Sequence, residues 1–213
     1  ELFDKCLPAF NQLRTFERAR SLALGVLSRV GRCTITGMLT ASGAQFLDWS
    51  AAYRLFKGKR MDMKKIFDIL RKESVHSNGS QEAYIYAHMD DTLLRKRGKK
   101  IFGTGWMRDP LGPPFASNFV WGHRFLQVSL SLLEKGTIGP SRAIPVDFVH
   151  CPAVKKPPKN ADDQAIATYN EQQKKEKMSA VGLQCINSLR ENLNADGFLG
   201  KKVILSVDGS YTN

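Results

Sequence analysis

The chain has 213 residues, of which 42% are hydrophobic and 24% are charged, a composition typical of one or two globular domains. Its 32 lysines and arginines against 20 aspartates and glutamates give a formal net charge of +12 at pH 7. We therefore expect a polyanionic partner, nucleic acid before an acidic membrane surface. No apolar run reaches the roughly 18 residues of a membrane span, so the sequence predicts neither a transmembrane helix nor a membrane partner.

No signal peptide is visible, and we expect a sequence trimmed at both ends, because it begins without Met and stops soon after its last predicted strand. The four cysteines, Cys6, Cys33, Cys151 and Cys185, form no Cys-x-x-Cys pair that would indicate a zinc site. We predict buried free thiols in a reducing compartment, the cytoplasm.

Residues 1 to about 75 carry the apolar spacing of helices. One helix is expected to stop at Gly31, and a second, short helix follows and ends near Gly43. A helix, a Gly-containing turn and a second helix are the layout of a helix-turn-helix, although a plain helical hairpin has the same periodicity. In the helix-turn-helix interpretation, the turn and the start of the second helix contact DNA phosphates. The residues at these positions are Arg32, Thr34 and Thr36.

A further helical stretch is predicted from residue 49 to about residue 72, with a basic turn at 57–60. The stretch 75–81 is polar and contains Gly and Ser, which indicates a domain boundary. We therefore predict a helical, DNA-binding domain over residues 1–80 and a second domain over residues 81–213.

Apolar runs in the second domain predict strands. We expect them at 83–90, at 99–103 after a basic turn, at 119–133 as one long strand or a hairpin, and at 142–149, where Pro145 marks an edge or a bulge. A long helix is predicted from about residue 162 to residue 194, ended by glycines, and a last strand over 201–207. The predicted fold class is mixed α/β.

Two of these predicted strands end in acidic residues. Asp90 and Asp91 end the first strand of the second domain, and Asp208 ends the last strand. If the two strands pair side by side, about 4.8 Å apart, Asp208 and one of the neighbouring aspartates can share a divalent ion. Carboxylates suit Mg²⁺, and such ions can drive phosphodiester cleavage. Strand alternation does not choose between Asp90 and Asp91, because a central strand can be apolar on both faces. Each acidic segment alone is equally compatible with a capping turn.

A basic run follows directly after the first acids and would line the path of a DNA backbone, or else form a solvated turn. Its members are Arg95, Lys96, Arg97, Lys99 and Lys100. Further along, Trp106, Trp121 and His123 could stack on an unpaired base, although we expect the two tryptophans to pack in the core.

Five segments, in this order, resemble the DDE transposases of bacterial insertion sequences. They are residues 49–56, 90–101, 108–115, 144–148 and 207–213. The resemblance implies the N-terminal part of an RNase H-like catalytic core, in which two Asp and a later Glu or Asp bind Mg²⁺ or Mn²⁺. The resemblance implies that Asp91 is the first acid, because an acid directly precedes Thr in the family, and Asp90 is the alternative. The second acid is Asp208. The third acid would lie beyond Asn213.

The resemblance further implies a DNA transposase that cuts phosphodiester bonds at transposon ends and transfers the freed 3′-OH into target DNA. We accordingly expect transposon ends and target DNA as partners, a homodimer on paired ends, and a place at the bacterial nucleoid. The alternatives are a DNA-binding remnant without catalysis and a stand-alone nuclease of the same fold. A merely basic α/β protein with capping aspartates would bind neither metal nor DNA.

Overall fold

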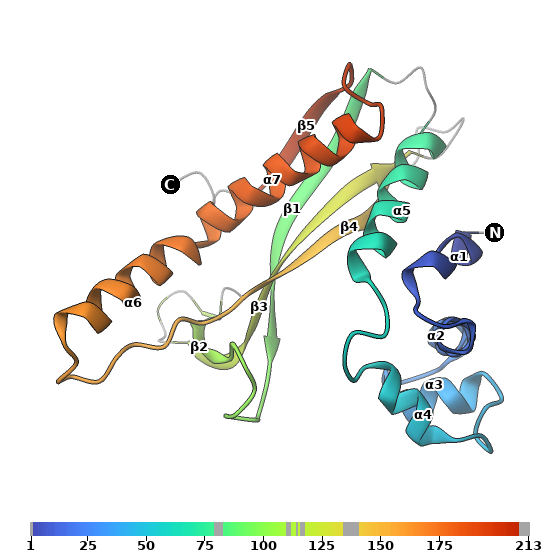
Figure 1. The fold of residues 1–213 in the computed structure, drawn as a ribbon, viewed down its shortest axis with the longest axis horizontal. Helices are drawn as coiled ribbons and strands as arrows, with labels where there is room; N and C mark the ends of the chain where they lie inside the picture. The colour runs from blue at the N-terminus through green and yellow to red at the C-terminus, as the bar shows by residue number, and fades with distance from the viewer. Residues whose placement is uncertain are drawn as a thin grey trace. The chain divides into compact units, whose positions relative to one another are not determined.

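A computed structural model describes residues 2–78, 83–109, 112–113, 115, 118–133 and 141–208 (Figure 1). The chain divides into two compact units, Glu1–Ile69 and Leu70–Asn213. The first is helical, and the second combines helices with a mixed sheet, so the predicted mixed α/β class is confirmed. Of the stretch predicted as a domain boundary, residues 79–81 lie outside the described residues, and the part before them is helical to Ser77.

The first unit contains four helices, one 3₁₀ helix and the beginning of a fifth helix among its described residues. They are α1 (Leu2–Lys5), η1 (Leu7–Ala9), α2 (Leu13–Ser28), α3 (Ile35–Ala41), α4 (Trp49–Leu55) and α5 (Met63–Ser77). Leu22, Leu39 and Leu55, one each from α2, α3 and α4, form the centre of its core. Gly25 allows α2 and α3 to lie close together, because a Cβ at this position would collide with the Met38 backbone. The helical stretch predicted over 49–72 and its basic turn are confirmed as α4, the turn and most of α5.

The second unit is organised around a five-stranded sheet. Its strands are β1 (Tyr84–Arg95), β2 (Gly105–Arg108), β3 (Phe119–Leu132), β4 (Arg142–Cys151) and β5 (Lys202–Val207). The order along the sheet is β2-β3-β1-β5, and β4 also pairs with β3. The pairs β1–β3, β2–β3 and β3–β4 are antiparallel, whereas β5 runs parallel to β1. The side-by-side pairing considered for the first and last predicted strands is therefore present.

The structure lacks one of the predicted strands and shows the form of another. The strand predicted at 99–103 is wrong: β1 extends to Arg95, and a turn then leads to β2 at Gly105. Gly103 has a φ of +74°, which a strand does not contain, and Thr104 donates its hydroxyl to the Ile101 carbonyl at 2.6 Å. Residues 119–132 form one long strand rather than a hairpin, and its pairing with β4 is irregular opposite Pro145, as the proline predicts.

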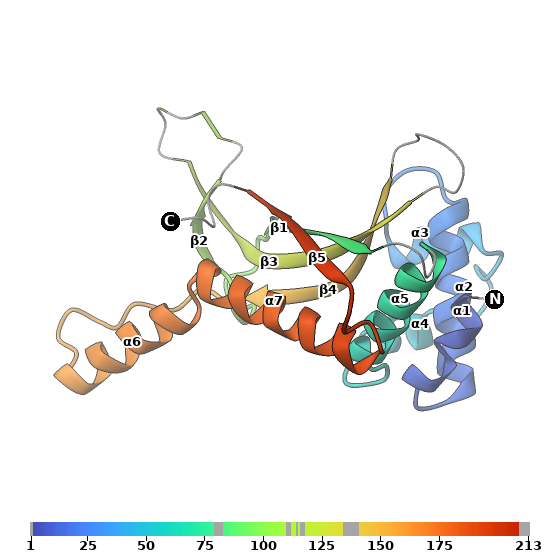
Figure 2. The same ribbon diagram turned by 90° about the horizontal axis from the view of Figure 1, so that it is seen from above.

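The long helix predicted over 162–194 is instead two helices, α6 (Asp163–Lys175) and α7 (Met178–Ala195). Helix α7 lies along one face of the sheet, while α6 continues past it (Figure 2). Val181, Cys185 and Leu189 recur every four residues on α7 and are buried in the same core as residues of β1, β3 and β4. No residue of α6 is buried, so packing does not require a continuous helix.

The last turn of α7 is tied to the second half of α5. Arg71 Nη2 lies 2.8 Å from Asp196 Oδ2, and only 6% of each side chain is exposed. Val75, one turn further along α5, joins the core beneath the sheet. Gly197, with a φ of +89°, ends the segment, as predicted for a glycine after a helix. In the described part of the chain, no helix is both long and apolar enough to cross a membrane.

Candidate active site

Asp90 and Asp208 come next to each other on neighbouring strands. The parallel register of β1 and β5 ends with Met89 opposite Val207, so the next residue on each strand is an aspartate. Residues that pair in parallel strands point to the same face of a sheet, and neighbouring strands are about 4.8 Å apart. Both aspartates are exposed, on the face of the sheet that carries His88 and Ser206. The register therefore places the backbones of Asp90 and Asp208 at adjacent positions, one step past the last paired residues.

Asp91 belongs to the opposite face. It alternates with Ala87 and Met89, which are buried in the core that α7 covers. Its carboxylate lies 3.3 Å from Arg124 Nε on β3, and the exposed fraction of its side chain is 20%. Arg124 Nε makes no aligned hydrogen bond with any described residue, so its contact with Asp91 is an ion pair. The structure therefore brings Asp90, and not Asp91, to Asp208.

The surroundings of Asp90 are polar. Gln127 of β3 lies directly opposite, and the next residue on the same face of β1, His88, hydrogen-bonds through Nε2 to Ser131 Oγ at 2.6 Å. Asp90 Oδ1 accepts a hydrogen bond from the Asp91 backbone N–H at 2.8 Å. The hydrogen bond from Asp91 orients the Asp90 carboxylate, and no basic side chain among the described residues forms an ion pair with it.

The pair Asp90–Asp208 fits a hard divalent cation in its donor chemistry. Mg²⁺ prefers carboxylate oxygens and usually keeps several waters, so one or two protein carboxylates are enough to hold it at a phosphate. Within the described residues, no cluster of three or more His, Cys, Asp or Glu could hold a metal ion. The two aspartates therefore fit Mg²⁺ or Mn²⁺ as part of a ligand set and not as a closed site.

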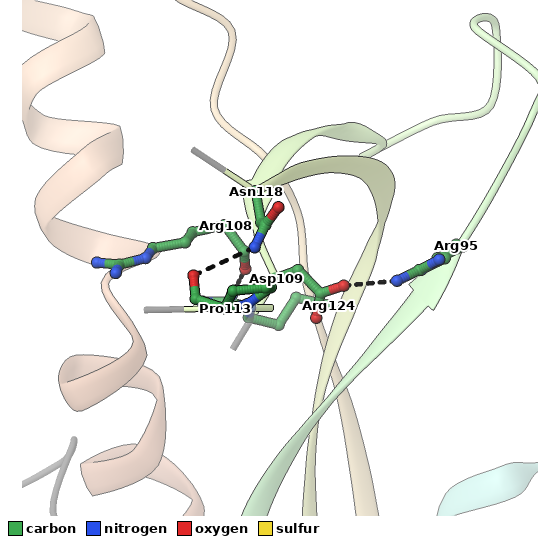
Figure 3. Close-up of polar contacts among 6 residues, drawn as sticks. All are labelled: Arg95, Arg108, Asp109, Pro113, Asn118 and Arg124. Atoms are coloured by element: carbon green, nitrogen blue, oxygen red, sulfur yellow. Dashed lines mark hydrogen bonds and ion pairs between the residues drawn. The ribbon is translucent and has the colours of Figure 1, made fainter. Parts of the chain in front are cut away.

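The predicted basic residues lie at the end of β1 and are all exposed. Arg95 is the last residue of the strand, and its Nη2 lies 2.6 Å from Oδ2 of Asp109, which follows β2 (Figure 3). Arg124 anchors the same corner by donating to the Arg108 carbonyl at 3.3 Å. The remaining four, Lys96, Arg97, Lys99 and Lys100, belong to the segment 96–104, which we call the basic loop. The charge of Arg95 is thus partly neutralised, and the basic loop carries the charges offered to solvent.

The basic loop is attached to the sheet by contacts that sequence reasoning missed. Trp121 donates its indole N–H to the Gly98 carbonyl at 3.0 Å, and His123 Nε2 lies 2.8 Å from the Phe102 carbonyl oxygen. Gly103 packs so closely on His150 that a Cβ would collide with the imidazole ring. These three contacts hold the backbone of the basic loop, and with it the positions of its lysines and Arg97, beside the end of β1.

His150 also belongs to a cluster of aromatic and imidazole rings next to the basic loop. Its ring centroid is 4.8 Å from that of His123 and 5.0 Å from that of Phe125, which stacks on Phe148 at 4.7 Å. Burial lowers the pKa of His150, the neighbouring His123 lowers it further, and Glu176 opposes the shift.

Trp106 contacts Trp121 edge to face but is 66% exposed, so the core position predicted for Trp106 is wrong.

The residues predicted to bind DNA in the first unit have local roles as well. Thr34 is the N-cap of α3: its hydroxyl accepts a hydrogen bond from the Gly37 N–H at 3.1 Å, and it lies 3.2 Å from the Thr36 hydroxyl. Arg32 is exposed in the connection between α2 and α3. The same connection exposes Cys33, so burial is confirmed for the other three cysteines and wrong for this one.

No protein-family model matches this chain, and no curated protein sequence matches it significantly.

Proposed function

We propose that this protein is a DNA-cutting and DNA-joining enzyme of the DDE transposase kind. The observation that carries the proposal is the placement of Asp90 and Asp208 at neighbouring positions on two parallel strands. The strand order adds support, because three antiparallel strands, a helical crossover and a strand parallel to the first are the layout that an RNase H-like core requires. Short strand β2 is an addition to that layout.

In this proposal Asp90 and Asp208 are the first two acids, and Asp91 is a structural residue that orients Arg124. When bound, Mg²⁺ or Mn²⁺ would activate the attacking water or 3′-OH and stabilise charge on the leaving oxygen. The two carboxylates would fix the position at which this occurs. The basic loop lies beyond the end of β1, where its four cations would bind the phosphates of the strand being cut. Transposon ends and target DNA would be the substrates, and the protein would then act at the bacterial nucleoid.

The proposal is first tested by metal binding, which requires no activity. Mn²⁺ binding is measured by electron paramagnetic resonance. We expect the affinity for Mn²⁺ to fall at least about tenfold in Asp90→Asn and in Asp208→Asn. Asp91→Asn is the matched control, since it removes the same charge from the neighbouring residue. Equal binding by all three variants, or loss in Asp91→Asn alone, would contradict the assignment.

Activity is then measured on the full-length protein as Mg²⁺-dependent nicking of supercoiled DNA, followed by strand transfer of a labelled 3′ end. Nicking that requires Asp90 and Asp208 supports the enzyme, and strand transfer distinguishes a transposase from a stand-alone nuclease. DNA binding that is unchanged in both variants, without nicking in the wild type, would instead establish a DNA-binding remnant.

A further inference from the structure

The helical unit holds a pocket lined by four arginines. Its volume is about 240 Å³, and it lies among the start of α2, helix α4 and the turn before α5. Arg14 and Arg18 come from α2, Arg54 from α4 and Arg60 from the turn. Asp48, the N-cap of α4, is the one acidic residue that lines the pocket. Four basic residues and one acidic residue therefore line the pocket.

Asp48 does not neutralise the pocket. Its Oδ2 accepts from Arg54 Nη2 at 3.0 Å, so this carboxylate is already paired with one of the four guanidinium groups. Within the part of the chain that the structure describes, the side chains of Arg14, Arg18 and Arg60 form no hydrogen bond or ion pair. Three arginines thus line a concave site, and their guanidinium groups have no counter-charge among the described residues.

Like charges gathered in a pocket repel one another, and an anion removes that repulsion. A guanidinium group presents several N–H donors in a plane, which matches the oxygens of a phosphate better than a lysine ammonium does. Glu17 lies on α2 between the two arginines but does not line the pocket. The pocket therefore has the charge and the donor type of a phosphate site.

We infer that this pocket binds a backbone phosphate of duplex DNA. The inference rests on the DNA-binding part of the proposed function and adds an anchoring point separate from the helix-turn-helix positions Arg32, Thr34 and Thr36. The pocket recognises the phosphate and not the base, so it strengthens binding to DNA of any sequence and positions the helical unit on the duplex.

The test compares the triple variant Arg14→Gln/Arg18→Gln/Arg60→Gln with Lys57→Gln/Lys59→Gln/Lys64→Gln. Both remove three charges from exposed or half-buried side chains of the same unit, but the lysines do not line the pocket. Arg54 and Asp48 are kept, because Asp48 caps α4. Circular dichroism and thermal unfolding check that both variants fold.

Binding is measured by fluorescence anisotropy with a labelled duplex of mixed sequence over a range of salt concentrations. We expect the arginine variant to bind at least about tenfold more weakly, and the slope of log K against log salt to fall by about 1 for each phosphate that the protein no longer neutralises. The lysine variant should bind less than about threefold more weakly than the wild type. Equal weakening in the two variants overturns the inference while leaving DNA binding intact.

Inorganic pyrophosphate separates the two sources of a phosphate group. In one outcome, the wild type does not bind DNA, but pyrophosphate raises its melting temperature and does not raise that of the arginine variant. The pocket then holds a small phosphate compound, and the DNA assignment is overturned. If neither probe binds, the inference fails entirely. Mn²⁺ binding at Asp90 and Asp208 is unaffected by the arginine changes in every case, so failure of the pocket and failure of the catalytic proposal are distinguishable.

Discussion

Asp90 and Asp208 are one step beyond the last paired residues of two parallel strands, so the backbone itself brings these two residues to adjacent positions. Asp91, the next residue after Asp90, lies on the other face and forms an ion pair with Arg124. These two neighbouring aspartates therefore have different surroundings. Asp90 is exposed and adjacent in register to Asp208, whereas Asp91 is partly buried beside the opposite charge of Arg124. This difference predicts opposite responses to the same substitution.

Asp91→Asn is expected to lower the free energy of unfolding by about 1–2 kcal/mol, because it leaves the half-buried Arg124 without its carboxylate partner. Asp90→Asn should change this free energy by less than about 0.5 kcal/mol, or raise it slightly, because it removes repulsion from Asp208. Urea unfolding at neutral pH and without divalent ions measures both values. A larger loss in Asp90→Asn than in Asp91→Asn would show that the faces are assigned in reverse.

The choice between these aspartates could not be made from the sequence. Tyr84, Tyr86 and His88 on one face of β1 are nearly as compatible with a core as Ile85, Ala87 and Met89 on the other. The buried face of β1 is the face on which α7 packs. The strand order and the helical crossover decide which face this is, and both depend on residues far along the chain from β1. The sequence predicted an acid at the end of each of these two strands, but it left the pairing of the strands and the identity of the first acid open, and β1 continues past Asp90 to Arg95.

The helical regions show the same limit. The apolar residues on α7 repeat every three or four positions, and their burial follows from that spacing. The same helical propensity continues upstream through α6, which has no buried face, so the sequence predicted one helix where the structure has two. The arginine pocket was not visible either, because Arg14 and Arg60 are far apart in the sequence and meet only when the helices pack.

The buried pair Arg71–Asp196 provides a second prediction. Asp196→Ala should lower the free energy of unfolding by about 3–5 kcal/mol, because it removes the Asp196 carboxylate from a guanidinium group that is only 6% exposed. Lys72 also contacts Asp196, at 3.3 Å, but its side chain is 52% exposed, so Lys72→Ala should cost less than about 1 kcal/mol. Chemical denaturation of both variants measures the difference, and similar losses would contradict a dominant role for Arg71.

The cysteines predict a reactivity pattern. Burial raises the pKa of the Cys185 thiol to about 11, with Asp147 and Cys151 adding to the shift, and burial likewise raises the pKa of Cys6. A neutral, buried thiol is a poor nucleophile, whereas Cys33 is exposed. Titration of the native protein with a disulfide reagent should therefore show one fast thiol, which Cys33→Ser removes. A fast phase that survives in Cys33→Ser would contradict this assignment.

His150 predicts how stability depends on pH. Its pKa in the folded protein is lowered by burial and then by His123, so between that pKa and the ordinary value of about 6.5 the unfolded chain binds more protons. The stability associated with neutral His150 is complete above about pH 6.5 and is lost as the pH falls through this window. The melting temperature of the wild type should therefore fall between about pH 7.5 and about pH 5.5.

His150→Phe should reduce that fall. Phenylalanine keeps the ring contacts with Phe125 and Phe102, and it removes a buried Nε2 that has no hydrogen-bond partner among the described residues, so we expect no loss of stability near neutral pH. His76→Phe is the control, since His76 packs its ring on Phe198 at the other end of the unit. If both variants show the same pH dependence as the wild type, His150 does not control it. If only His150→Phe flattens the curve, protonation of His150 accounts for the fall in melting temperature.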